Sequence, residues 1–220
     1  MCGRRRKLQV MRGDELSGAN YPLMSDAMNL VALQDARALL ESGAEHFQSR
    51  KMENARKDFE KALSIARTNK LPVTEAKSLF NIGNVYKYQL RFREAVTPYH
   101  KALTVFRSCR HSFWQLDDSL DTRLEVNILV SLGYTYSRLG VQSKAIEYTK
   151  QILDISPSYA DAYYNLGCYF SILEDAEKAL EYLSKGKAYF DGTVIRSSRT
   201  DPDLSFVRND RRFRKIMYED

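Results

Sequence analysis

The sequence predicts an all-α protein built from stacked helical hairpins, and three observations lead to that prediction. A glycine followed three residues later by an aromatic residue recurs in "NIGNVYKYQL" (81–90), "SLGYTYSRLG" (131–140) and "NLGCYFSILE" (165–174). Apolar residues around these glycines repeat every three or four positions, which places them on one face of a helix. An alanine also follows a glycine by twelve residues at four places: Gly43/Ala55, Gly83/Ala95, Gly133/Ala145 and Gly167/Ala179.

Each of the four units, which begin near residues 36, 76, 126 and 160, divides into two helical patterns. The first pattern carries the glycine and the second carries the alanine. A glycine inside a helix costs about 1 kcal/mol relative to alanine, so its recurrence needs a packing reason. We expect the glycine of one helix to face the alanine of the next. The two antiparallel helices can then approach closely, and the aromatic residues fill the space where their axes diverge.

These hairpins resemble the tetratricopeptide repeat (TPR) family, whose repeats are 34 residues long. Gly133 and Gly167 are 34 residues apart, and Pro157 stands where that family often places a proline. The earlier glycine spacings are 40 and 50 residues. We therefore expect the linkers "RTNKLPVTE" and "RSCRHSFWQLDDSLDTRLE" to lengthen helices. The resemblance implies a right-handed superhelix (α-solenoid) of about four repeats near 36–69, 76–109, 126–159 and 160–193, within an array spanning 25–190. An unrelated helical bundle is the alternative.

The closing segment, 191–220, contains "TDPDLSFVRNDRRFRKI", which is similar to the "DPDLxxLRxDxRF" tail that ends the array in many proteins of this family. The resemblance implies a C-terminal capping helix. Apolar side chains of this segment would cover the exposed side of the last repeat, while its charged residues face water. We expect the covering residues to be Leu204, Phe206, Val207, Phe213 and Ile216. A ligand-like arm is the alternative.

The net charge of +6 is concentrated at the two ends of the chain. Residues 1–12 hold five basic residues and no acidic one, and residues 196–220 hold seven basic against five acidic residues. The stretch 13–195 is therefore nearly neutral, with a net charge of −1. A basic overall balance that comes from the ends is weak support for a nucleic-acid-binding core, so no nucleic acid partner is expected.

Residues 1–24 read as a basic, disordered N-terminal tail. The three cysteines, Cys2, Cys109 and Cys168, are odd in number and scattered, which favours a reducing compartment and predicts a cytoplasmic protein. No run is long enough to span a membrane, so stable membrane insertion is not expected. The "RRRK" run leaves nuclear import open, and Cys2 beside it leaves lipid tethering open.

The inner face of the superhelix is the candidate binding site, because the resemblance implies that the first helix of each pair lines the concave side. Asparagine both donates and accepts hydrogen bonds, so it can hold the backbone of an extended peptide. Lysine and arginine would favour an acidic peptide, and tyrosine offers amphipathic contact area. The alternative is that these residues simply form the solvated faces of the repeat helices and bind nothing. The predicted peptide-binding residues are Lys77, Asn81, Asn84, Lys87, Tyr88, Asn127, Tyr134, Arg138, Tyr164 and Asn165.

The carboxylate clamp of co-chaperones with these repeats is essentially absent. Leu40 and Ala44 stand at the unit-one positions where that clamp has lysine and asparagine. Asn81 fits the second unit, but Asn127 and Ser131 replace the basic pair of the third. The groove asparagines instead look partly like the adaptor repeats of kinesin light chains and G-protein-signalling scaffolds. The sequence thus favours a non-enzymatic scaffold or adaptor; a co-chaperone-type or RNA-associated repeat protein is the alternative.

An enzyme is not expected. The histidines His46, His100 and His111 lack an accompanying nucleophile motif, and the phosphate-binding pattern "GxxxxGK" is missing. No cofactor and no metal site are predicted, since Cys109 and His111 have no second ligand pair at metal spacing. The partner and the oligomeric state stay open. So does the role of the linker 107–125 around Trp114, which could be core or a second docking surface.

Overall fold

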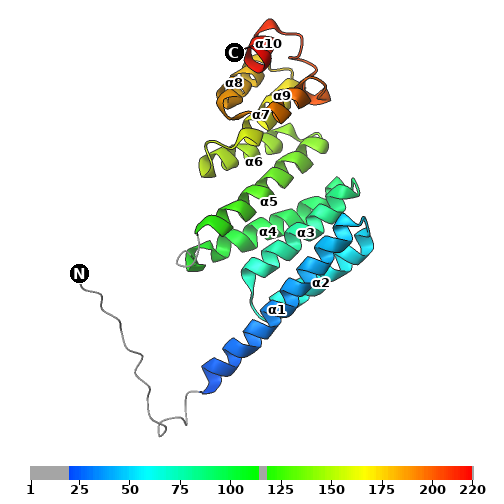
Figure 1. Ribbon diagram of the computed structural model, residues 1–220, viewed down its shortest axis with the longest axis vertical. Helices are drawn as coiled ribbons and strands as arrows, with labels where there is room; N and C mark the ends of the chain where they lie inside the picture. Colours follow the sequence, from blue (N-terminus) through cyan, green and yellow to red (C-terminus); the bar gives the residue numbers. More distant parts are fainter. Residues whose placement is uncertain (1–19, 114–117, 220) are drawn as a thin grey trace, which may run out of the picture.

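The computed structural model describes residues 20–113 and 118–219, and within these ranges it contains helices and no strand. The helices follow one another along an elongated stack (Figure 1). They are α1 (Asn20–Gln48), α2 (Met52–Thr68), α3 (Pro72–Tyr88), α4 (Phe92–Phe113), α5 (Asp118–Arg138), α6 (Gln142–Ile155), α7 (Ala160–Ile172), α8 (Ala176–Gly186), η1 (Lys187–Tyr189), α9 (Gly192–Ser198), η2 (Pro202–Leu204) and α10 (Arg211–Tyr218).

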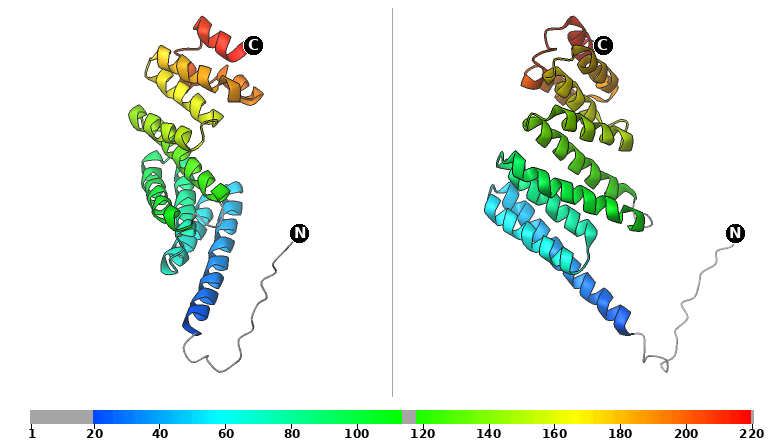
Figure 2. Two further views of the ribbon diagram at one scale, coloured as in Figure 1. Left: turned by 90° about the vertical axis from the view of Figure 1, so that its left-hand side faces the viewer. Right: turned by 180° about the vertical axis from the view of Figure 1, so that it is seen from behind.

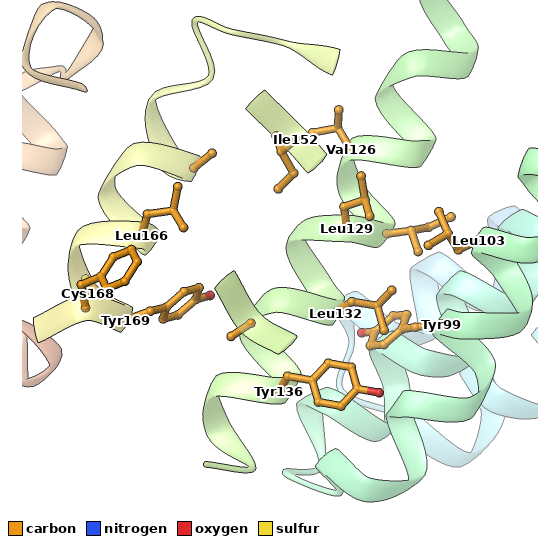
Figure 3. Close-up of a cluster of buried hydrophobic side chains, with 14 of the residues drawn as sticks. Tyr99, Leu103, Val126, Leu129, Leu132, Tyr136, Ile152, Leu166, Cys168 and Tyr169 are labelled. Atoms are coloured by element: carbon orange, nitrogen blue, oxygen red, sulfur yellow. The ribbon is translucent and has the colours of Figure 1, made fainter. Parts of the chain in front are cut away.

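Consecutive helices pair as antiparallel hairpins, α1 with α2, α3 with α4, α5 with α6 and α7 with α8. Each hairpin packs on the next, and the rotated views show the stack winding as it rises (Figure 2). One continuous core, drawn in part in Figure 3, runs from Ala76 in α3 to Met217 in α10. The predicted all-α solenoid is confirmed.

Both unusual linkers are largely helical, as expected. In the first, α2 continues to Thr68 and α3 begins at Pro72, where proline suits the first turn of a helix. In the second, α4 continues to Phe113 and α5 begins at Asp118. Trp114, Cys2 and most of the predicted tail 1–24 lie outside the described residues, so the predictions about them stand as they were. The domain limits at 190 and 191 also remain predictions.

In the four hairpins the side chain nearest each glycine is not that of the predicted alanine, although the Ala145 carbonyl oxygen lies 3.4 Å from where a Cβ would stand on Gly133. Each glycine lies under the side chain found sixteen residues later, on the second helix of the same hairpin. The alanines are fully buried beside these contacts. A bulky side chain can therefore lie flat on the bare backbone of the first helix. The pairs are Gly43/Phe59, Gly83/Tyr99, Gly133/Thr149 and Gly167/Leu183.

Unit three has the smallest of these partners, Thr149, and a side chain from the next unit helps to fill the space. The hydroxyl of Tyr169 lies 3.6 Å from where a Cβ would stand on Gly133. Tyr169 is buried in the core, and burial raises the pKa of its phenol, which therefore stays neutral. Packing inside one repeat is here completed by its neighbour.

In units three and four, the aromatic residue three positions after the glycine packs on a ring of the second helix of its hairpin. Tyr136 stacks on Tyr148 with ring centroids 5.6 Å apart, and Phe170 stacks on Tyr182 at 5.4 Å. Offset stacking of this kind adds about 0.5–1.5 kcal/mol beyond the burial of apolar area. The aromatic of the recurring motif thus holds its two helices together.

Alanine at position 83 is expected to destabilise the protein. An added Cβ would lie 2.5 Å from Cε1 of Tyr99, whose ring is fully buried and cannot move away freely. Overpacking costs about 1–3 kcal/mol, and better helix propensity returns about 1 kcal/mol. Urea unfolding of Gly83→Ala should therefore show a loss of up to about 2 kcal/mol. The control is Gly192→Ala, where the nearest atom is Arg196 Nη1 at 3.5 Å; equal losses from both would contradict this packing.

The turn within each hairpin uses a left-handed residue seven positions after the glycine. Arg50, Leu90 and Glu174 have φ of 58°, 59° and 59°, and Gly140 has φ of 76° at the same place in unit three. Glycine adopts this conformation without steric cost, whereas other residues are strained there by about 1–2 kcal/mol. Three of the four turns therefore have a residue other than glycine at a position where glycine would avoid this strain.

The C-terminal segment folds back over the last hairpin, in agreement with the predicted cap. Helix η2 packs on α7. Helix α10 packs on α8 (Figure 1). Arg212 of α10 donates two hydrogen bonds to the Glu177 carboxylate of α8, at 2.8 and 3.0 Å. Phe206 was expected in the buried cover, but it is 49% exposed. The fully buried covering residues are Leu204, Val207, Phe213 and Met217.

Candidate peptide-binding groove

A groove of about 850 Å³ lies on the inner face of the array, mainly between α3 and α5. Helix α1 contributes one side chain to it and α7 another. Most of the remaining lining comes from α3 and α5, and Leu90 comes from the turn after α3. The lining residues are Phe47, Phe80, Asn84, Lys87, Tyr88, Leu90, Asn127, Val130, Ser131, Tyr134 and Asn165.

The structure brings six of the ten predicted site residues together in this groove. These six are Asn84, Lys87, Tyr88, Asn127, Tyr134 and Asn165. The lining of this groove does not include the other four, Lys77, Asn81, Arg138 and Tyr164.

Two of these four, Lys77 and Arg138, are exposed. Asn81 lines a smaller pocket of about 110 Å³ beside Phe47 and Phe59. The candidate groove is therefore centred on units two and three, while Asn81 points toward unit one.

Lys87 is the central electrostatic feature of the groove. It is half-buried, and its Nζ donates to Ser131 Oγ at 3.3 Å. Burial lowers its pKa, because removal from water disfavours the charged form. Within the part of the chain that the structure describes, no carboxylate lies at ion-pair distance from this ammonium group. A negatively charged ligand atom would restore the stabilisation that the cation lost on burial.

Asn84 is held in place by a hydrogen bond from the second helix of its hairpin. The hydroxyl of Tyr99 donates to Asn84 Oδ1 at 2.8 Å. Burial raises the pKa of Tyr99, so its phenol stays protonated and keeps this donor role. The amide NH₂ of Asn84 is then left to donate into the groove.

Aromatic rings form the sides of the groove. Tyr88 packs edge-on against Phe47 with centroids 5.4 Å apart, and Tyr134 packs edge-on against Phe92 at 6.0 Å. Both tyrosines remain partly open to solvent, at 47% and 44%. Each ring is thus fixed on one edge and free on the other, which suits contact with a ligand that has both apolar and polar groups.

Five lining residues are not among the ten predicted site residues: Phe47, Phe80, Val130, Ser131 and Leu90. Of these five, Leu90 alone lies outside the helices. It is 73% exposed and lies in the left-handed turn after α3. In the sequence Leu90 aligns with Gly140, which occupies the corresponding turn of unit three. A leucine that is both exposed and conformationally strained is a candidate for ligand contact.

The hydroxyl group of Tyr164 is bound by the chain's own C-terminal segment. It donates to Asp201 Oδ2 at 2.7 Å, and burial raises its pKa, so that it remains a neutral donor. The open groove therefore ends near Asn165, one residue further along α7. The C-terminal segment covers the part of the inner face that lies beyond it.

A serine, a histidine and an aspartate meet in unit one, but their order does not activate the serine. Ser42 Oγ donates to Asp58 Oδ2 at 2.8 Å, and His46 Nδ1 lies 2.9 Å from the same oxygen. A catalytic arrangement would place the histidine between the serine and the carboxylate. Among residues 20–113 and 118–219 there is no cluster of three potential metal ligands, nor any helix long and apolar enough to cross a bilayer.

A family model described as "Tetratricopeptide repeat" matches residues 36–69, 126–159 and 160–189. The chain belongs to the tetratricopeptide repeat family. Residues 76–109 are not among the matched segments, yet α3 and α4 form the same hairpin, with Gly83 under Tyr99. TPR repeats are typically non-enzymatic modules for protein–protein interaction, and their presence here supports a protein–protein interaction scaffold in general.

One sequence relative and one solved structure illustrate the similarity. The chain is 27% identical over 129 residues to the human intraflagellar transport protein 88 homolog, a match covering 58% of the chain and only 14% of that protein. The crystal structure of MamA protein superposes with a TM-score of 0.59 at 16% identity, covering 84% of the chain and 92% of MamA. At that identity the superposition supports the fold alone.

Proposed function

We propose that this TPR scaffold binds an extended, acidic segment of a partner protein in the groove between α3 and α5. The observation that carries the proposal is the half-buried ammonium group of Lys87, which has no carboxylate beside it among the residues that the structure describes. Among the lining residues that the structure describes, Lys87 is the only charged one. A carboxylate on the partner would complement it without repulsion from any of them.

The polar lining supports an extended rather than a compact ligand. Asn84, Asn127 and Asn165 come from three successive hairpins, so they line the groove along the stacking direction. Carboxamides spaced in this way can bond to successive backbone groups of a peptide, irrespective of its side chains. Tyr88 and Tyr134 then offer ring surface to the side chains between those groups.

Removing the charge of Lys87 tests the proposal. Peptides selected from a random displayed library on the full chain should be enriched in aspartate and glutamate. Lys87→Met keeps the length of the aliphatic stem and should cost about 1.5–3 kcal/mol, the value of a hydrogen bond to a charged group, or roughly tenfold to a hundredfold in affinity. Fluorescence anisotropy measures the affinity, and circular dichroism checks that the helix content is unchanged.

The matched control is Lys101→Met, because Lys101 is an exposed lysine on α4, outside the lining of the groove. Its affinity for the selected peptides should equal that of the unmodified chain. Equal affinities for all three proteins, or no enrichment of acidic residues in the selected peptides, would count against the proposed site.

The affinity should also depend on pH in a direction set by Lys87. Burial lowers the pKa of Lys87 in the free chain, and a bound carboxylate raises it again, so the complex holds a proton that the free chain loses. Affinity is therefore full below the lowered pKa and falls as pH rises through it, earlier than for an ordinary lysine. Titration calorimetry across the alkaline range measures this decline. Lys87→Met should remove it; a decline that persists in that variant would contradict the assignment.

A further inference from the structure

The chain's own C-terminal segment shows what the inner face of a repeat can hold. Asp201 precedes η2 and accepts the hydroxyl of Tyr164 at 2.7 Å, and its Oδ2 lies 3.9 Å from Cys168 Sγ. Both contacts are with α7. Three residues after Asp201, Leu204 is fully buried and belongs to the main core. A short acidic segment with a leucine therefore covers the inner face of unit four.

The α7 face that this segment covers corresponds to the groove in units two and three. Tyr164 stands three residues before Gly167, and Cys168 stands one residue after it. In units two and three the same positions carry Phe80 with Asn84 and Val130 with Tyr134, and these four residues all line the open groove. The surface filled by the chain in unit four is thus left unfilled in the two preceding units.

The open units are better prepared for a carboxylate than the covered one. The Asp201 carboxylate accepts hydrogen bonds from the neutral hydroxyl of Tyr164 on α7 and, within its own segment, from the backbone N–H of Asp203 at 3.0 Å. The nearby Asp203 has a raised pKa, chiefly because it is partly buried and also because Asp201 is close, although Arg138 opposes the rise. In the groove, the cation of Lys87 and the free amide NH₂ of Asn84 replace these weaker partners.

We propose that the groove accepts a protein segment with the chemistry of residues 201–204, an acidic residue followed three positions later by leucine. This inference rests on the proposed function and specifies which acidic segments the groove binds. The carboxylate meets Lys87 and Asn84, and the leucine packs on the apolar lining formed by Phe80 and Val130. Acidity alone is not sufficient, because the apolar part of the groove needs a side chain to cover it.

The test uses the full chain and a fluorescent peptide with the sequence of residues 199–208, "RTDPDLSFVR". Two altered peptides accompany it, one with asparagine in place of both aspartates and one with serine in place of the leucine. Anisotropy should show measurable binding of the unaltered peptide and about tenfold weaker binding of each altered peptide. Lys87→Met should weaken the unaltered peptide to the level of the asparagine peptide, and Lys101→Met should not.

A second variant shows where the peptide binds. Tyr164→Phe removes the hydroxyl that holds Asp201, so it would loosen the chain's own segment and raise the affinity if the peptide merely exchanged with that segment on α7. Unchanged affinity in Tyr164→Phe supports the groove. Three results would overturn the proposal: increased affinity in Tyr164→Phe, equal binding of the three peptides, or an affinity for the unaltered peptide that does not change in Lys87→Met.

The outcomes also separate this inference from the proposed function. The library-selected peptides could lose affinity in Lys87→Met and yet lack an acidic residue three positions before a leucine. That result would leave the proposed function intact and reject this motif. If Lys87→Met weakens the binding of neither the selected peptides nor the peptide of residues 199–208, the proposed function and this motif are both wrong.

Discussion

Replacing Phe213 with alanine is expected to destabilise the C-terminal cap by about 3–5 kcal/mol, the usual cost of removing a fully buried phenylalanine. Phe213 has no exposed surface and packs edge-on against Tyr218 within α10, with centroids 5.9 Å apart. Because α10 lies on α8, its loosening exposes the apolar side of the last repeat. Urea unfolding should show the loss, and hydrogen exchange should show it concentrated in α8 and α10.

Phe206 provides the control within the same segment. It is 49% exposed, so Phe206→Ala should change the free energy of unfolding by no more than about 0.5 kcal/mol. Similar losses from the two alanine variants would mean that the cap is not held by the buried face of α10. A large loss in Phe213→Ala without faster exchange in α8 would also contradict this account of the cap.

Replacing Tyr99 with alanine is expected to cost about 3–5 kcal/mol and to disturb the groove as well. The ring of Tyr99 is fully buried against Gly83, and its removal leaves a cavity between α3 and α4. Asn84 Oδ1 also loses the donor that orients its amide. Thermal unfolding measures the first effect, and the affinity for a groove peptide measures the second.

Two further substitutions separate the two roles of Tyr99. Tyr99→Phe keeps the ring and should cost only about 1 kcal/mol, the net value of one hydrogen bond. Tyr88→Ala removes a half-exposed ring from the groove, so it should weaken peptide binding and lower stability only by its contact with Phe47, about 0.5–1.5 kcal/mol. If Tyr99→Phe were as damaging as Tyr99→Ala, the packing of the ring on Gly83 would not be the main contribution.

The helical hairpins could be predicted from the sequence because a glycine inside a helix is costly. Its repetition in Gly83, Gly133 and Gly167 therefore reports close helix contact. The prediction paired each glycine with the alanine twelve residues later and did not identify the larger side chain that lies over the glycine. The structure uses the side chain four residues further on, one helical turn away and on the same face. Tyr169, which reaches the Gly133 contact from another repeat, depends on how two units are stacked, and no local spacing encodes that.

The inner face could be predicted as a set of positions, but its limits could not. Helical periodicity places Asn84, Lys87 and Asn127 on the first helices, and the structure brings them together. Whether Tyr164 is open depends on Asp201, which lies 37 residues further along the chain. Leu90 could not be predicted as a lining residue because it lies in a turn, where helical periodicity does not indicate which way a side chain points. Both depend on tertiary geometry rather than on pattern.

The most direct test of the binding account is to map the contact surface by NMR. Backbone amide shifts of the labelled full chain would be followed as an acidic, leucine-containing peptide is added. The account predicts that the largest changes lie in α3 and α5 around Asn84, Lys87 and Asn127, extend to Asn165, and are lost in Lys87→Met. Changes centred on the outer helices α4 and α6, or a pattern in α3 and α5 that persists without the Lys87 charge, would contradict it.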